Sequence, residues 1–247
     1  RLRRARQGVR QALRAEVSEA GQTRVRRVRS FEKLRSTRFA DGVNALCWER
    51  TLPGDYAEVI AKLGPGEGIV PIDDERLRAL DLSPAGLLAA EAMLADQRLL
   101  RDHDLAPSLN CVYDCVRGPD AGTVPTDVTS FHVDSAPVEV DTWLCTYHGA
   151  CSEGLRNEDA LLKVEIPEIR SKLLKEYGGT DDAGFAEFLH EHSYDSHYAP
   201  KPDTKPYPFG IFVLWRIATR WPGSPVPPCV HRAPENHPGS PRLLLIS

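Results

Sequence analysis

The spacing of apolar residues changes after the first hundred residues of the chain. Up to that point, apolar side chains recur every three or four positions, which is the period of an amphipathic helix. Asp55 and Ser83 are typical N-cap residues, Pro84 fits the first turn of a helix, and Gly64 is typical of a helix end. We therefore expect helices over residues 56–63 and 84–101, preceded by a short strand at residues 43–48.

From residue 107 onward, short β-prone segments dominate the chain. Branched and aromatic residues are enriched in them, as is typical of strands. The predicted strands cover residues 108–116, 129–133, 142–147, 210–218, 227–231 and 242–246. Helical periodicity interrupts them at residues 167–177 and 182–192. Eleven of the 20 prolines lie between Ala199 and Pro241, which excludes helix there and indicates loops and edge strands.

This order of elements predicts an α+β protein. Helices come first, and short strands with an inserted helical segment follow, so we expect a small β-barrel or sandwich braced by N-terminal helices. A length of 247 residues is compatible with one domain. We expect residues 1–40 to form a basic helical arm and residues 41–247 to form the main domain.

The net charge of −4 is unevenly distributed along the chain. Residues 1–38 hold 13 Lys and Arg against 3 Asp and Glu, a balance of +10, so the remainder carries −14. Leu2, Val9, Leu13 and Val17 share one helical face, which predicts a basic amphipathic helix. Such a helix fits nucleic acid, an acidic partner or a membrane surface, and equally its own acidic domain or a second subunit of a homodimer.

Cysteine usage and hydropathy indicate the cellular compartment in which the protein is expected. The six cysteines form no CxxC pair, and their spacing is not that of a small disulfide scaffold. We therefore expect reduced thiols in a cytoplasmic protein. No apolar run approaches the roughly 18 residues of a membrane span, and the arginine-rich start shows no signal peptide.

The sharpest chemical feature is the pair formed by His132 and Asp134. Residues two apart in a strand point to the same face, so this imidazole and this carboxylate project together. His231, which ends a β-prone segment far along the chain, is the best candidate for a third ligand. Two histidines and one carboxylate on one face bind Fe(II) and leave positions open for a cosubstrate and O₂. A surface pair, or a hydrogen-bonded core histidine, is the alternative.

Arg242 opens the last apolar strand, and ten residues separate it from His231. That separation allows a turn and a return on the neighbouring strand. An arginine that leads into a buried strand needs a partner, and a carboxylate held by two guanidinium nitrogens suits it best. A structural ion pair is the alternative role for Arg242.

The pattern of His132-x-Asp134, a distant His231 and then Arg242 resembles the oxygenases that depend on Fe(II) and 2-oxoglutarate. The resemblance covers roughly residues 107–247. It implies a double-stranded β-helix, which is a jelly-roll or cupin-like core, with a helical insert at about residues 150–200. The stretches 142–149 and 229–234 are similar to an uncharacterised bacterial branch.

The resemblance also implies cosubstrate contacts. Arg242 is expected to bind the distal carboxylate of 2-oxoglutarate, while the other end of that molecule binds the iron. Asn110-x-x-Tyr113 is similar to a motif of nucleic-acid dealkylases, which places Asn110 and Tyr113 near the cosubstrate. Some branches carry Ser two residues after the arginine, where this chain has Leu244. The second carboxylate contact is therefore expected from Tyr113 or Thr142.

The implied reaction is hydroxylation of a small molecule, with consumption of O₂ and release of succinate and CO₂. His148, Trp143 and Arg232 are the candidate substrate contacts, with solvent exposure or core packing as their alternatives. No catalytic residue beyond the metal site is expected. A histidine cluster at residues 190–197 is not an HExxH motif and predicts a helix end and loop, or a lid.

Three other functions remain open at this point. The same oxidation could act on nucleic acid or protein, with the basic arm docking nucleic acid. A non-catalytic metal-binding β-barrel would use the same three ligands without turnover. A zinc hydrolase would use them without a cosubstrate.

Overall fold

The computed structural model describes residues 24–115, 122–236 and 238–247. The amphipathic pattern of residues 2–17 lies outside this part of the chain. Within it, the fold is a mixed α+β structure, as the sequence predicts. None of the described helices is both long and apolar enough to cross a membrane.

The described part of the predicted arm is integrated in the fold. It forms strand β1 (Val25–Val28) and helix α2 (Phe31–Ser36). β1 pairs in parallel with β2 (Ala45–Trp48), and two apolar residues of α2, Phe31 and Leu34, are buried in the main core.

The largest element is a seven-stranded sheet with the order β1-β2-β10-β5-β12-β4-β3. Every neighbouring pair is antiparallel except β1 with β2. The remaining strands are β3 (Ile69–Pro71), β4 (Ser108–Val112), β5 (Asp141–His148), β10 (Leu214–Ala218) and β12 (Arg242–Ile246).

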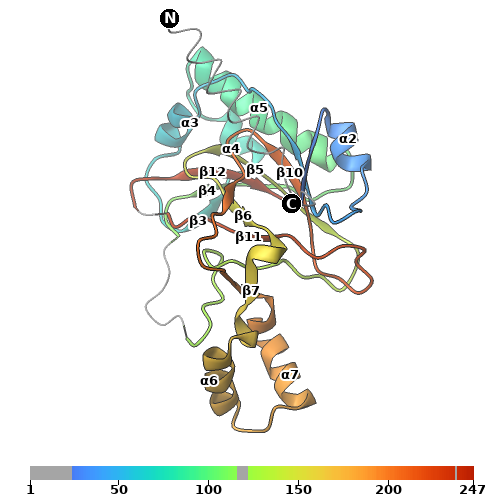
Figure 1. The fold of residues 1–247 in the computed structure, drawn as a ribbon. Helices are drawn as coiled ribbons and strands as arrows, with labels where there is room; N and C mark the ends of the chain where they lie inside the picture. Colours follow the sequence, from blue (N-terminus) through green and yellow to red (C-terminus); the bar gives the residue numbers. More distant parts are fainter. Residues whose placement is uncertain (1–23, 116–121, 237) are drawn as a thin grey trace, which may run out of the picture.

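Helices cover one face of this sheet (Figure 1). They are α2, α3 (Tyr56–Leu63), α4 (Asp74–Arg78) and α5 (Pro84–Arg101). The predicted N-caps are confirmed, because Asp55 accepts from Glu58 N–H at 3.0 Å and Ser83 accepts from Gly86 N–H at 3.2 Å. Trp143, in β5, packs in the helix-covered core, so its neighbour Thr142 points to the opposite face.

A smaller sheet faces that opposite side. Its order is β11-β6-β9, with β11 (Val230–Arg232), β6 (Glu153–Leu155) and β9 (Tyr207–Pro208). Residues 131–134, which we call the ligand segment, extend it through an isolated bridge between His132 and His231. Leu144, Phe209 and Cys229 belong to one apolar cluster between the two sheets.

A helical insert separates β6 from β9, close to the predicted residues 150–200. Its helices are α6 (Pro167–Tyr177) and α7 (Ala183–Glu191), flanked by the paired strands β7 (Ala160–Leu162) and β8 (Tyr198–Pro200). Short 3-10 turns are η1 (Asn157–Asp159), η2 (Lys163–Glu165) and η3 (Tyr194–Ser196). The insert packs around a small apolar core that also includes Val124, from the segment before residue 131. It projects away from the sheets on the side opposite α5 (Figure 1).

Several strands are shorter than predicted. β10 begins at Leu214 because Gly210 and Phe212 have φ angles of 79° and 66°, which turn the chain rather than extend it. Residues 129–133 do not form the predicted strand. A turn, closed by a hydrogen bond from Ser130 N–H to Asp127 O, occupies its start, and only His132 makes β-bridges.

Candidate metal centre

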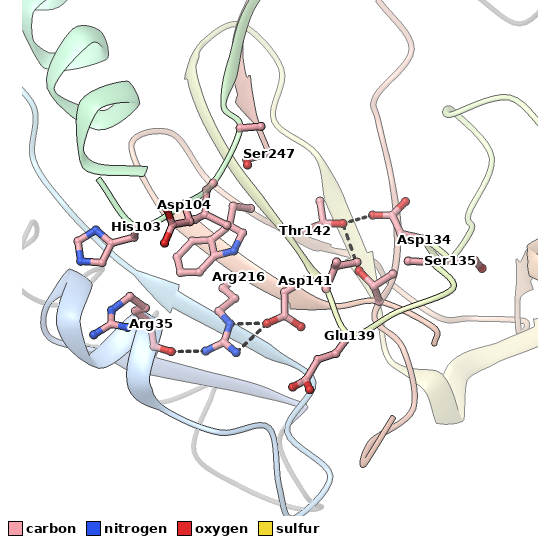
Figure 2. Close-up of a pocket in the computed structure, with 16 residues that line it drawn as sticks. Arg35, His103, Asp104, Asp134, Ser135, Glu139, Asp141, Thr142, Arg216 and Ser247 are labelled. Atoms are coloured by element: carbon pink, nitrogen blue, oxygen red, sulfur yellow. Dashed lines mark hydrogen bonds and ion pairs between the residues drawn. The ribbon is translucent and has the colours of Figure 1, made fainter. Parts of the chain in front are cut away.

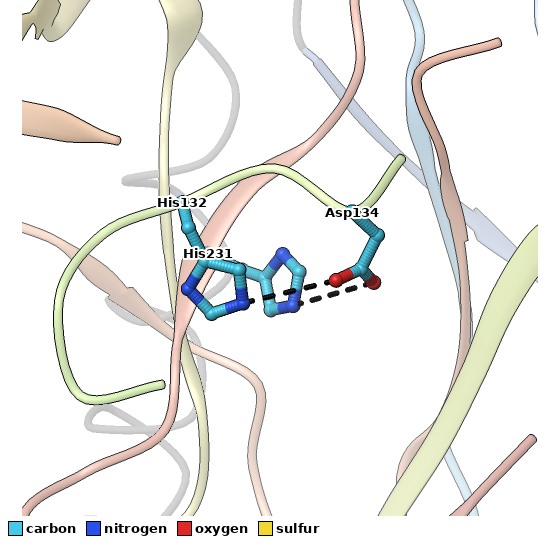
Figure 3. A group of neighbouring side chains, drawn as sticks. All are labelled: His132, Asp134 and His231. Carbon is cyan, nitrogen blue, oxygen red and sulfur yellow. Dashed lines mark ion pairs between the residues drawn. The ribbon is translucent and has the colours of Figure 1, made fainter. Parts of the chain in front are cut away.

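Three candidate ligands converge where the ligand segment meets β11. Each of His132 and His231 donates its backbone N–H to the carbonyl of the other at 2.9 Å. Directly opposed residues place their side chains on the same face, and the two ring centroids lie 4.6 Å apart. Asp134 turns its carboxylate toward both rings (Figure 3).

Backbone carbonyls orient both imidazole rings. His132 Nδ1 lies 2.8 Å from Ser130 O, and His231 Nδ1 lies 3.2 Å from Cys229 O. Because a carbonyl only accepts, Nδ1 carries a hydrogen in each ring, and Nε2 is the nitrogen that is left to bind a metal.

The free ring nitrogens point at the carboxylate. Nε2 of His132 lies 3.7 Å from Oδ1 of Asp134, and Nε2 of His231 lies 3.7 Å from Oδ2. One ligand atom from each of the three residues lies within 4.8 Å of the others. This donor set could hold a metal ion, and its chemistry fits the two imidazoles and one carboxylate of an Fe(II) site.

The carboxylate is fixed by the large sheet. Thr142, at the start of β5, donates its hydroxyl hydrogen to Oδ2 of Asp134. The backbone carbonyl of Asp134 accepts from Arg220 N–H at 2.8 Å, in the loop after β10. The large sheet therefore positions the carboxylate, while the small sheet positions the two histidines.

Burial sets the protonation of one ligand. Removal from water lowers the pKa of His231, and the nearby Asp134 carboxylate opposes that shift. The neutral imidazole that burial favours is also the form that binds a metal. The side chains of His132 and Asp134 are 15% and 32% exposed, so the centre remains open to solvent on one side.

Arg242 is buried at the start of β12. It is 1% exposed, and burial lowers the pKa of its guanidinium. Nε donates to Ala150 O at 2.6 Å, but Nη2 has no hydrogen-bond partner among the described residues. Gly149 packs closely against it, since a Cβ at this position, where φ is +83°, would lie 2.9 Å from Arg242 Cγ.

The other predicted cosubstrate contacts lie on both faces of the large sheet. Thr142 lies at the metal centre. Asn110 is buried in β4 opposite Leu244, and its amide donates to Ser108 O at 3.1 Å. Tyr113 packs in the helix-covered core, on the other face of the large sheet from Thr142.

The predicted substrate contacts are also dispersed. Trp143 is 4% exposed in the helix-covered core, where its ring centroid lies 5.8 Å from that of Phe31. Arg232 is paired with Glu153 at 2.7 Å and lies over the ring of Phe131. His148 is half-buried at the end of β5.

A cavity of about 540 Å³ opens beside Asp134 and Thr142 (Figure 2). Arg216 and Asp141 form a pair in its wall, with Nε donating to Oδ2 at 2.7 Å. Nη1 of Arg216 donates to three backbone carbonyls, those of Leu34, Arg35 and Thr37. The Arg216 guanidinium in this wall thus already has hydrogen-bond acceptors within the protein.

Two residues near the ligands were not predicted as site residues. His197 pairs its backbone with His132, and their ring centroids lie 5.8 Å apart. It belongs to the histidine cluster of residues 190–197, whose spacing matched no metal motif. Arg220 carried no local signal, because all its site contacts are distant in sequence.

Comparison of this chain with protein-family models, with curated proteins and with solved structures found no match. Its function is therefore inferred from its own residues and geometry.

Proposed function

We propose that this chain is a non-haem Fe(II)- and 2-oxoglutarate-dependent dioxygenase that hydroxylates a small molecule. The observation that carries the proposal is the donor set of His132, Asp134 and His231, whose ligand atoms lie within 4.8 Å of one another. Two imidazoles and one carboxylate on one face are typical of Fe(II) centres that keep coordination positions open.

The strand pairing supports a double-stranded β-helix around this site. From β4 onward, and leaving out the insert, the extended segments in chain order are β4, the ligand segment, β5, β6, β9, β10, β11 and β12. The first pairs with the last, the second with the seventh, the third with the sixth and the fourth with the fifth. A chain paired in this way is one long antiparallel hairpin wound around an axis, as a jelly roll requires.

Arg242 supports 2-oxoglutarate as the cosubstrate. Its guanidinium is buried, Nη2 lacks a partner, and it makes no ion pair within the described chain. An unpaired buried charge is costly, so a carboxylate delivered by a ligand would be strongly favoured there. A dicarboxylate can supply one end to the arginine and the other to the metal.

Each residue then has a distinct task. When bound, Fe(II) and 2-oxoglutarate supply the oxidising chemistry, in which O₂ is consumed, succinate and CO₂ are released and one oxygen atom enters the substrate. The two histidines would bind the metal through Nε2. Thr142 holds one oxygen of Asp134 and so fixes the direction of the other. Arg242 holds the distal carboxylate.

The proposal is tested by anaerobic titration of the protein with Fe(II) and 2-oxoglutarate, followed through the weak visible charge-transfer band of the chelate. The wild type is expected to show the band. Asp134→Ala should lose Fe(II) binding and the band together. Arg242→Met should keep Fe(II) binding and require a much higher 2-oxoglutarate concentration.

Asp181→Ala is the matched control, because this carboxylate pairs with Arg170 in the insert and is remote from the ligands. It should titrate like the wild type. Absence of the band in the wild type, or binding of Zn(II) with no response to 2-oxoglutarate, would reject the proposal.

A second candidate, the same oxidation of nucleic acid, is favoured by one observation. Residues 24–38 contain seven Lys and Arg against one Glu. Of these, Arg26 is exposed on β1, at the edge of the large sheet, and Arg29 is exposed directly after this strand. Neither forms an ion pair within the described chain. A free strand edge lined with arginine suits a phosphate backbone.

This candidate is tested by measuring single-stranded DNA binding as salt concentration rises. Arg26→Gln/Arg29→Gln should weaken binding and flatten its salt dependence. The slope of the logarithm of the binding constant against the logarithm of salt concentration should change by about 0.7 per lost phosphate contact. The control is Arg78→Gln/Arg98→Gln, which removes two exposed arginines of α4 and α5. Equal effects of both double variants would reject specific docking on β1.

A further inference from the structure

The ligand segment is hydrogen-bonded along both of its edges. On one edge it pairs with β11 through His132. On the other edge, Val133 N–H donates to Ser196 O at 3.0 Å, and Tyr198 N–H donates to Phe131 O at 2.8 Å. Ser196 and Tyr198 belong to η3 and β8, so the helical insert is bonded directly to the strand that carries His132.

Arg220 reaches this junction from the loop after β10. Its backbone N–H donates to Asp134 O at 2.8 Å, and its carbonyl accepts from Ala136 N–H at 2.8 Å. Its guanidinium donates from Nε to Ser135 Oγ at 3.0 Å, from Nη1 to Asp195 O at 3.0 Å and from Nη2 to Asp195 Oδ1 at 3.3 Å. One residue therefore contacts both the loop that follows the metal-binding carboxylate and the insert.

Asp195 is held from its other side as well. The side chains of Arg220 and Asp195 are 33% and 27% exposed, so the pair is partly shielded from solvent. His190 Nδ1, at the end of α7, lies 3.0 Å from Asp195 Oδ2. The carboxylate that receives Arg220 is thus anchored to a helix of the insert.

We propose that Arg220 is a positioning residue of the metal centre, which fixes the backbone at Asp134 and couples it to the helical insert. The inference rests on the proposed function, because it concerns the same metal site. Arg220 acts through Asp134 and Ser135 and does not itself bind the metal. Without its guanidinium, the loop after Asp134 keeps only main-chain bonds, and the insert loses its side-chain link to that loop.

The test is a Co(II) titration of the wild type, Arg220→Gln and Arg220→Lys, followed by the visible ligand-field spectrum. Loss of a residue that orients a ligand typically weakens metal binding about 10- to 100-fold, and we expect a loss of this size with a changed spectrum for Arg220→Gln. Lysine keeps the charge but replaces the planar fork, whose separate nitrogens reach Ser135 and Asp195, with a single ammonium group, so Arg220→Lys should be intermediate.

Arg170→Gln is the matched control. Arg170 makes a bidentate pair with Asp181 at 2.5 and 2.7 Å in the same insert, and its side chain is 37% exposed. Removal of this pair disturbs the insert without touching the ligand segment. The variant should keep the wild-type Co(II) affinity and spectrum.

A second readout needs no metal. Hydrogen–deuterium exchange of metal-free protein should be faster at the amides of Val133 and Ala136 in Arg220→Gln than in the wild type, and unchanged in Arg170→Gln. This measurement reports directly on how tightly the loop and the insert are held.

The outcomes separate the two proposals. Wild-type Co(II) binding and wild-type exchange in Arg220→Gln would overturn the inference, as would an equal loss of Co(II) affinity in Arg170→Gln. If the wild type itself binds no Co(II), the proposed function fails. Hydrogen–deuterium exchange then tests the claim that Arg220 holds the loop after Asp134 against the insert. Equal exchange rates in all variants would show that Arg220 does not hold the loop.

Discussion

At the scale of single residues, the direction of every ligand atom depends on one hydrogen bond. His132 and His231 each use the carbonyl two residues before them, whereas Asp134 uses Thr142, eight residues later. The sequence predicted that His132, Asp134 and His231 lie together. Strand alternation places the first two on one face, and His231 was the candidate because it ends a β-prone segment. It did not predict that Thr142 contacts Asp134 rather than a cosubstrate, because that contact depends on how the two sheets stack.

Thr142→Val tests the contact to the carboxylate. Valine matches threonine in shape and removes the hydroxyl, so Oδ2 of Asp134 loses its donor and the carboxylate can rotate. Metal affinity should fall about tenfold or more, with little change in thermal unfolding. Isothermal titration with Co(II) measures the effect. Thr146→Val, in the same strand, is the control, and an equal loss there would contradict this role.

The pair of Asp74 and Arg101 predicts how stability depends on pH. Two hydrogen bonds, at 2.9 and 3.0 Å, join α4 to α5, and they lower the pKa of Asp74 below its ordinary value of 3.8. The unfolded chain therefore takes up this proton at a higher pH than the folded protein. The stabilisation is present above the unfolded pKa and is lost as the pH falls through the folded pKa.

Asp74→Asn should therefore destabilise the protein at neutral pH, by less than about 1 kcal/mol because the pair is partly exposed. As the pH falls through the lowered pKa of Asp74 in the folded protein, the variant and the wild type should converge. Urea unfolding at neutral and at acidic pH measures this. A difference that stayed constant across the range would show that charge is not the cause.

At the scale of elements, local signals located the helices better than the strands. Asp55 and Ser83 cap the helices that the sequence predicted, because capping involves only neighbouring residues. Short strands such as β1 and β9 carry no such signal. Their existence depends on pairing with segments far along the chain, and pairing register has no local signature.

The attachment of α5 to the large sheet depends on a buried polar network. Arg50 Nη1 lies 2.5 Å from Asp96 Oδ1, and Tyr147 donates its hydroxyl to Asp96 Oδ2 at 2.7 Å. The side chains of Arg50 and Asp96 are each 7% exposed. Arg50→Met leaves a buried carboxylate without its counter-charge and should cost about 3–5 kcal/mol in urea unfolding. Arg50→Met/Asp96→Leu should recover part of this loss, and a double variant no better than the single one would contradict the explanation.

At the scale of the whole molecule, the helical insert contacts the candidate metal centre from outside the two sheets. β6 and β9 are adjacent antiparallel strands, so a short turn can replace residues 157–206 without changing their pairing. Apart from Val124, the apolar cluster that holds the insert together is made of the insert's own residues, which favours folding of the two sheets without it. The α+β class and the approximate position of the insert were predictable, whereas its bonds to the ligand segment were not.

A variant with a Gly-Ser turn in place of residues 157–206 should fold but bind metal at least about tenfold more weakly, because the ligand segment loses its partners Ser196 and Tyr198. Circular dichroism establishes folding, and Co(II) titration measures the affinity. Wild-type affinity in the shortened protein would show that β11 alone positions the histidines.

The pairing of the first strand of the β-helix order with the last also bears on when, during folding, the candidate metal centre can form. β4 pairs with β12, and His132 pairs with His231, so the contacts that complete the site span most of the described chain. Contacts between residues so distant in sequence form slowly, because loop-closure entropy opposes them until many have formed together. We therefore expect the complete donor set to form late in folding. A metal ion that bound there would stabilise the finished fold by mass action rather than act as its nucleus.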